Sequence, residues 1–119
     1  MKNILIIDDS AAMRAIISAV LKDKGFDVTE TVNGEEGLKK ASENEYDMVI
    51  TDLNMPNMDG FTVIQNLRTY AAYESIPVLV LTTELSPEKE LQGKDCGATE
   101  WVTKPFNPEQ LMQAVQKYI

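Results

Sequence analysis

Short apolar runs alternate with amphipathic stretches along the whole chain. The run at 3–7 is too short for a helix and is rich in Ile, which is typical of a strand buried on both faces. Apolar residues then recur at three- and four-residue spacing from Met13 to Leu21, which predicts a helix capped by Ser10 and stopped by Gly25. Further strands are predicted at 26–31, 47–51, 78–81 and 100–103, and further helices at 35–44, 61–70, 86–96 and from the Asn107 cap onward.

This strict alternation of strands and helices indicates an α/β fold, in which a parallel sheet is covered by helices on both faces. No linker, repeat or low-complexity tract interrupts the pattern. A length of 119 residues with 44% hydrophobic content fits one domain over 1–119. In such sheets ligands bind beyond the carboxyl ends of the strands, so we expect functional residues there.

Composition excludes several classes of function. With 11 Lys+Arg against 19 Asp+Glu the formal net charge is −8, so neither nucleic acid nor an anionic membrane is an expected partner. The absence of His and the single Cys96 exclude zinc enzymes, Ser/His and Cys/His triads, and an internal disulfide. No apolar stretch approaches the roughly 20 residues of a membrane span and no signal peptide is evident, so we expect a cytoplasmic protein.

Five polar residues stand where predicted strands end. Asp8 and Asp9 follow the first strand, Asp52 ends the third, Thr82 ends the fourth, and Lys104 follows the fifth. An isolated acidic pair at a strand end is usually a solvated loop charge, but here several strands agree. Because parallel strands end at the same edge of a sheet, these side chains are expected to form one site.

Three carboxylates at this edge require a cation. At separations of about 4 Å and an effective dielectric near 20 they would repel by roughly 4 kcal/mol per pair, a large cost for a domain stable by about 5–15 kcal/mol. An incomplete set of oxygen ligands favours Mg²⁺ over Ca²⁺. A calcium-binding loop beginning at Asp52 is disfavoured, because Pro56 and Asn57 occupy the places of a ligand and of the turn glycine.

A carboxylate beside bound magnesium can attack phosphorus and form an acyl phosphate. Asp52 is the expected nucleophile, because it ends what should be a central strand and leaves Asp8 and Asp9 to hold the metal. Lys104 supplies an ammonium group and Thr82 a hydroxyl for the transferring oxygens. This division of roles is a hypothesis.

Four segments resemble response-regulator receiver domains, most closely their single-domain, CheY-like chemotaxis branch. They are IDDS at 7–10, TDLNMPNMDG at 51–60, LTTE at 81–84 and VTKPF at 102–106. Each is weak alone, but together and in this order they are specific, and the resemblance covers nearly the whole chain. It implies the flavodoxin-like strand order 2-1-3-4-5, of which CheY is an established example.

The resemblance also implies roles for the site residues. Asp52 would be the phosphoacceptor, and Asp9, Asp52 and the backbone carbonyl of Asn54 would bind Mg²⁺. Asp8 would act on the ion largely through water. Lys104 would contact the phosphoryl group.

A conformational switch is implied as well. Thr82 would move to hydrogen-bond a phosphate oxygen, and Trp101 would turn inward into the vacated space. Without the resemblance, Trp101 would be read as a half-buried aromatic on an edge strand. Thr83 and Glu84 stand at modulating positions, and Thr83 is bulkier than the Ala or Gly of many receivers. A cis peptide is implied before Pro105.

The implied partners are a CheA-like histidine kinase as phosphodonor and a flagellar motor switch protein, or another output protein, on the face around Trp101. The chain is expected to act as a monomer. The segment 86–96 has few apolar residues and Gly93 within its helix, which fits a movable element. Leu53 and Ala114 differ from residues of some CheY proteins, so the motor interface stays open. A phosphate sink or phosphorelay intermediate outside chemotaxis is the alternative.

Two other functional classes are disfavoured. A haloacid-dehalogenase-type phosphatase would need an Asp-x-Asp arrangement after the first strand, which 8–10 lacks. A flavodoxin-like cofactor binder would have a phosphate-binding loop where this chain has two negative charges. We therefore expect a switch that catalyses its own phosphorylation and dephosphorylation, not a conventional enzyme.

Overall fold

The computed structural model describes residues 2–84 and 86–119. Within these residues five strands alternate with five α-helices, as the hydrophobic pattern predicts. The strands are β1 Asn3–Ile7, β2 Asp27–Thr31, β3 Met48–Asp52, β4 Val78–Thr82 and β5 Glu100–Thr103. The helices are α1 Ala11–Asp23, α2 Gly34–Glu43, α3 Gly60–Leu67, α4 Pro87–Cys96 and α5 Pro108–Gln116, with a short 3₁₀ helix, η1, at Ala71–Tyr73.

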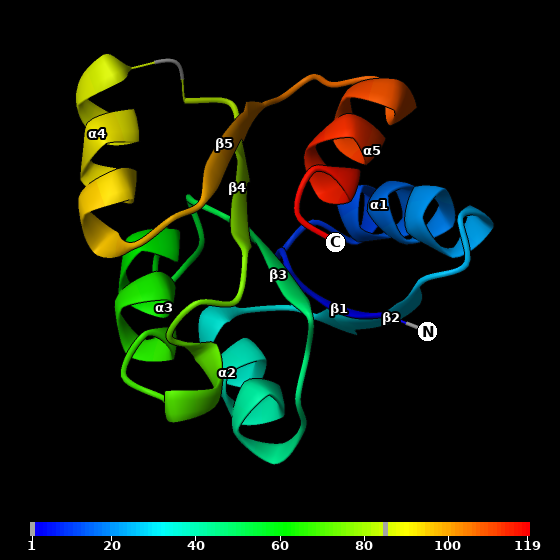
Figure 1. Ribbon diagram of the computed structural model, residues 1–119. Coiled ribbons are helices and arrows are strands. Elements are labelled where there is room, and N and C mark those ends of the chain that lie inside the picture. Colours follow the sequence, from blue (N-terminus) through cyan, green and yellow to red (C-terminus); the bar gives the residue numbers. More distant parts are fainter. Residues whose placement is uncertain (1, 85) are drawn as a thin grey trace.

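All neighbouring strands pair in parallel, in the order β2-β1-β3-β4-β5. The flavodoxin-like order implied by the resemblance is thus confirmed. Figure 1 shows α1 and α5 on one face of the sheet and α2, α3 and α4 on the other. Because β3 lies at the centre, Asp52 ends a strand that has neighbours on both sides.

Each face of the sheet buries its own apolar cluster, because successive residues of a strand point to opposite sides. Leu5 and Ile7 of β1 pack with α2 and α3, whereas Ile4 and Ile6 pack with α1 and α5. All four are fully buried. The first strand is therefore buried on both faces, as its run of apolar residues predicts.

Side-chain caps begin all five described α-helices. In each case the capping oxygen accepts a hydrogen bond from a backbone amide of the first turn, and the capping residues are Ser10, Asn33, Asp59, Ser86 and Asn107. The predicted caps Ser10 and Asn107 are confirmed. At Asn107 the Gln110 side chain also accepts from the Asn107 amide, which completes a capping box.

The helix predicted at 61–70 is shorter in the structure. α3 ends at Leu67, and the chain continues into η1. Arg68 accounts for the difference, because its Nη1 donates to the backbone carbonyls of Tyr73 at 2.8 Å and Ile76 at 2.7 Å. These contacts between distant residues hold the chain in a turn that local periodicity does not predict.

α4 is weakly attached to the rest of the molecule, as its composition predicts. Gly93 is its only buried residue, and its first turn carries Glu88 and Glu90. Among the described residues no helix combines the length and the apolar character that crossing a bilayer requires.

Candidate functional site

Three carboxylates meet at the carboxyl edge of the sheet. Asp8 and Asp9 lie in the loop after β1, and Asp52 is the last residue of β3. One oxygen from each of the three lies within 4.8 Å of the others. The predicted clustering of these residues is therefore present, with Asp8 buried, Asp52 half-buried and Asp9 exposed.

Lys104 is the cation of this cluster. Its Nζ lies 3.2 Å from Asp8 Oδ2 and 3.6 Å from Asp52 Oδ1. The backbone places it there, because the Lys104 amide donates to the Thr82 carbonyl at 2.7 Å and so continues the pairing of β4 with β5. The peptide bond between Lys104 and Pro105 is cis, as the resemblance implies.

The charges of the site act on Asp52 in opposing directions. Burial is the largest influence and raises the pKa of the Asp52 carboxyl, and the charges of Asp8 and Asp9 raise it further. Lys104 and the Leu53 amide lower this pKa, but they do not cancel the rise. Asp52 is therefore a carboxylate whose negative charge is incompletely compensated by the protein.

The loop after Asp52 approaches α3 closely. Asn54 lies in this loop two residues beyond Asp52 and is exposed. The Gly60 amide donates to the Leu53 carbonyl at 2.8 Å. A Cβ on Gly60 would lie 2.5 Å from the Asp52 carbonyl oxygen, so glycine is required at the start of α3. Asn57 takes the left-handed conformation in the same loop, with φ of 70°.

The predicted switch residues lie beside the cluster, on the α4 side of the sheet. Thr82 is fully buried, and its Oγ1 accepts a hydrogen bond from the Glu84 amide at 3.2 Å. The Glu84 carbonyl in turn accepts from Trp101 Nε1 at 3.3 Å. Thr83 is exposed. A chain of contacts therefore links the end of β4 to β5.

The Trp101 indole is half-buried and packs under α4. Its ring stacks on Phe61 with centroids 6.4 Å apart, and a Cβ on Gly93 would lie 2.9 Å from its Cζ3. In this structure the indole already contacts the interior. The inward turn implied by the resemblance would therefore start from a partly inward position.

Arg14 belongs to the surroundings of the site but lies outside the sequence motifs that predict it. Its Nη1 donates to the Asp8 backbone carbonyl at 2.7 Å. One signal was present in the sequence: Arg14 lies near the start of a predicted helix, where acidic residues are favoured over cationic ones.

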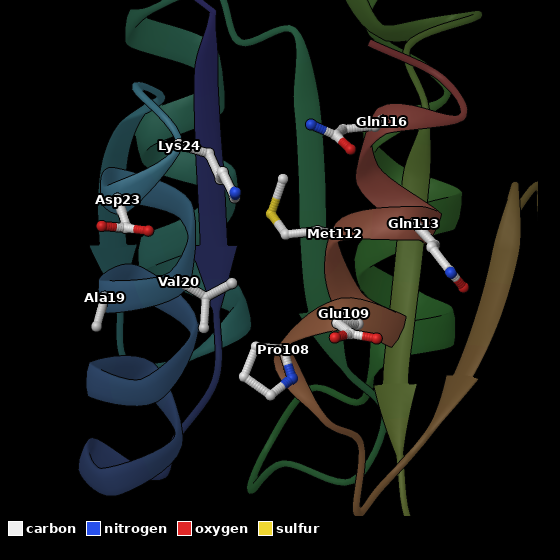
Figure 2. Close-up of a pocket in the computed structure, with 9 residues that line it drawn as sticks. All are labelled: Ala19, Val20, Asp23, Lys24, Pro108, Glu109, Met112, Gln113 and Gln116. Carbon is white, nitrogen blue, oxygen red and sulfur yellow. The ribbon is translucent and has the colours of Figure 1, made fainter.

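The larger grooves lie away from the three carboxylates. One of about 710 Å³ runs between α1 and α5, and Figure 2 shows Val20 and Lys24 on one side of it and Pro108 and Met112 on the other. Another of about 570 Å³ follows β5 and α5 and is lined by Trp101 among others. Neither of these grooves is lined by Asp8, Asp9 or Asp52.

Comparison with known proteins places this geometry in a family context. The family model described as "Response regulator receiver domain" matches residues 4–116. The chain is 40% identical over 116 residues to the DNA-binding dual master transcriptional regulator RpaA of Synechocystis, covering 98% of this chain and 48% of that protein. It is 36% identical over 118 residues to the sensor histidine kinase CheAY of Helicobacter pylori, covering 98% of this chain and 15% of that protein. The chain therefore spans half or less of these relatives.

A solved structure matches over nearly its full length. The chemotaxis response regulator CheY4 of Vibrio cholerae superposes with a TM-score of 0.96 and 43% identity, covering 100% of this chain and 99% of that one. The chain thus has the same fold as a solved chemotaxis regulator, and its relatives include a transcriptional regulator and a sensor histidine kinase.

Proposed function

The chain belongs to the response regulator receiver domain family of two-component signalling, and we propose that Asp52 is the residue on which it accepts a phosphoryl group. Receiver domains take phosphate from histidine kinases and act on output partners, and they are not conventional enzymes. The main support for this proposal is that three separate strand ends bring together Asp8, Asp9, Asp52 and Lys104.

The proposed reaction uses the Asp52 carboxylate as nucleophile toward a phosphohistidine of the kinase. A bond forms between a carboxylate oxygen and phosphorus, the bond from phosphorus to the imidazole nitrogen breaks, and its electron pair leaves with the imidazole. Lys104 Nζ, 3.6 Å from Asp52 Oδ1, is near enough to contact the transferred group. Its positive charge stabilises the negative charge that the phosphoryl oxygens bring to the site.

The residues present fit a magnesium ion. Asp8, Asp9 and Asp52 offer only oxygen ligands, and their charge exceeds that of the Lys104 ammonium, so a hard dication is the expected occupant. Asp9, Asp52 and the Asn54 carbonyl would hold the ion, and Asp8 would act on it largely through water. When bound, Mg²⁺ neutralises the charge that accumulates on the phosphoryl oxygens.

The proposed output runs from Thr82 through Trp101. Thr82 leaves its contact with the Glu84 amide to hydrogen-bond a phosphate oxygen, which frees the loop whose Glu84 carbonyl accepts from Trp101. The indole then moves further inward, and the surface formed by α4, β5 and α5 changes. Thr83 and Glu84 modulate the lifetime of the phosphoryl group because they border this path.

The proposed partners are a CheA-like histidine kinase and a flagellar motor switch protein, with the chain acting as a cytoplasmic monomer in chemotaxis. The likeness to the chemotaxis regulator CheY4 supports this. The groove lined by Trp101, Ala114 and Lys117 is the proposed docking place of the output partner. The alternative is a phosphate sink or relay intermediate, and chemotaxis receptor and kinase genes beside this one would favour the motor role.

The test of the proposal is incubation with acetyl phosphate and Mg²⁺, followed by intact-mass measurement. Wild type is expected to gain the mass of one phosphoryl group, and chelation of the metal is expected to prevent this. Asp52→Asn should gain none, whereas Asp27→Asn, a matched change of an exposed carboxylate on β2, should behave as wild type. Labelling of Asp52→Asn at the wild-type rate would show that another residue is the phosphoacceptor.

A further inference from the structure

Asp8 is held at each of its polar groups. Its amide donates to the Thr31 carbonyl at 3.2 Å, its Oδ1 accepts from the Ser10 amide at 2.8 Å, and its Oδ2 accepts from Lys104 Nζ at 3.2 Å. Its backbone carbonyl accepts from Arg14 Nη1 at 2.7 Å. Arg14 is the one of these partners that lies within a helix, since Ser10 precedes α1 as its cap.

Arg14 is itself fixed from a third element. Its Nε lies 3.5 Å from Glu30 Oε1 on β2, and the Arg14 side chain is only 14% exposed. The guanidinium therefore joins α1, the end of β1 and β2. A lysine could not reproduce this, because its single ammonium lacks the planar fork that presents two donors in fixed directions.

We propose that Arg14, oriented by Glu30, is a positioning residue that holds the backbone at Asp8 and Asp9 so that the carboxylates are pre-arranged for a divalent cation. This rests on the proposed function, since it concerns the same metal site. At Asp8, Arg14 contacts the backbone carbonyl and not the carboxylate. Arg14 therefore fixes the position of the ligands without neutralising them directly.

A positioning role and a purely electrostatic role of Arg14 predict opposite changes in Mg²⁺ affinity when the side chain is removed. A positive side chain beside a cation site repels Mg²⁺, so removing Arg14 would strengthen binding if its charge alone mattered. If Arg14 positions the ligands, its removal weakens binding. Partners of this kind, which orient metal ligands without touching the metal, typically contribute about tenfold or more to metal affinity.

The experiment is a titration of the full chain with MgCl₂. Binding is monitored by the amide NMR spectra of isotope-labelled protein. Arg14→Met and Arg14→Lys are both expected to raise the Mg²⁺ dissociation constant about tenfold. Lys22→Met, which removes an equal charge from the last turn of the same helix, should not raise it. Adding Glu30→Gln to Arg14→Lys should cause no further loss, because Glu30 acts through Arg14.

Amide hydrogen exchange of the metal-free protein gives a second readout. The Ser10 amide, which donates to Asp8 Oδ1, is expected to exchange faster in both Arg14 variants, whereas the Val80 amide in the central sheet should not change. Equal acceleration at both amides would mean loss of global stability and would contradict local positioning.

The outcomes separate this inference from the proposed function. Tighter Mg²⁺ binding by Arg14→Met, with unchanged binding by Arg14→Lys, would overturn positioning in favour of charge. Unchanged affinity in both variants would overturn it as well. If wild type bound no Mg²⁺, the proposed metal site itself would fail. In that case the exchange of the Ser10 amide would still test positioning, and a rate in the variants no faster than in wild type would refute it.

Discussion

Asp52 occupies surroundings that oppose its own ionisation. Burial, followed by the charges of Asp8 and Asp9, raises the pKa of its carboxyl above the ordinary value of 3.8, and Lys104 compensates only in part. A raised pKa means that the folded state favours the protonated acid. Ionisation of Asp52 therefore costs stability as pH rises above 3.8, and the full cost is present above the raised folded-state pKa.

Asp52→Asn should therefore stabilise the metal-free protein near neutral pH. Asparagine keeps the shape of the side chain without its charge, so the cost of ionisation disappears. The gain should shrink as pH falls toward 3.8, because wild-type Asp52 is then increasingly protonated. Urea unfolding of both proteins across this range measures the difference, and a gain that is independent of pH would contradict the electrostatic explanation.

Mg²⁺ should make wild type more stable than Asp52→Asn. A ligand that binds only the folded state stabilises it by about 2.7 kcal/mol at one hundred times its dissociation constant. Wild type should gain this amount, and Asp52→Asn should gain less because it lacks one of the three carboxylates. The same unfolding measurement with Asp27→Asn serves as the control, and equal gains in all three proteins would place the ion elsewhere.

Among the helices, α4 depends on a few specific contacts. Gly93 lets the Trp101 indole approach the helix, and the Lys89 ammonium lies 5.8 Å from the centre of the Phe61 ring. At its far end, the Gly97 carbonyl accepts from Arg68 Nε at 3.1 Å and Nη2 at 2.6 Å. The two ends of this helix are thus attached by different kinds of contact.

Gly93→Ala should move Trp101 outward. In an open helix position alanine stabilises relative to glycine by about 1 kcal/mol, but here the new Cβ would meet the indole. We expect greater quenching of Trp101 fluorescence by a neutral quencher. Gln92→Ala, at an exposed neighbouring position, is the control. Unchanged quenching in Gly93→Ala would show that the indole does not depend on this glycine.

Arg68→Met should destabilise the fold by about 1–3 kcal/mol, the range for leaving buried polar groups without a partner. The affected carbonyls belong to Tyr73, Ile76 and Gly97. Arg68→Lys should recover only part of the loss, because its compact ammonium lacks the planar fork that directs separate nitrogens to separate carbonyls. Urea unfolding is the measurement, and a loss within about 0.5 kcal/mol would class Arg68 with ordinary surface residues.

Across the whole molecule, the acidic site and the proposed output surface are joined through β4 and β5. Thr82 ends β4 next to Thr103 of β5, and Trp101 pairs with Val80 in the same ladder. The groove between α1 and α5 lies on the face of the sheet opposite α4 (Figures 1 and 2). We therefore expect a change at Thr82 to affect Trp101 and α4 more directly than α1.

Beryllium fluoride with Mg²⁺, a stable phosphoryl mimic, should lower the quencher accessibility of Trp101. The indole is only half-buried, so further inward movement has room to register. Thr82→Ala should reduce the change, because the hydroxyl that would follow the mimic is gone. A shift in emission without a change in accessibility would indicate a field effect of the charged site, and would leave Trp101 as ordinary packing.

The order of residues alone determined the α/β alternation, the buried first strand, the caps at Ser10 and Asn107, and the weak attachment of α4. These follow from periodicity and from contacts between near neighbours, which a sequence displays directly. The grouping of Asp8, Asp52 and Lys104 also followed, since parallel strands end at one edge. The strand order required the resemblance, because alternation is compatible with several orders.

Only the tertiary structure decided what depends on distant residues. Arg68 ends α3 early through carbonyls of later segments, and Gly93 is required by an indole from β5. Arg14 reaches the Asp8 carbonyl and Glu30 only because α1 folds back over β1 and β2. Such contacts leave no local period in the sequence, because they arise from where the folded chain brings separate elements together.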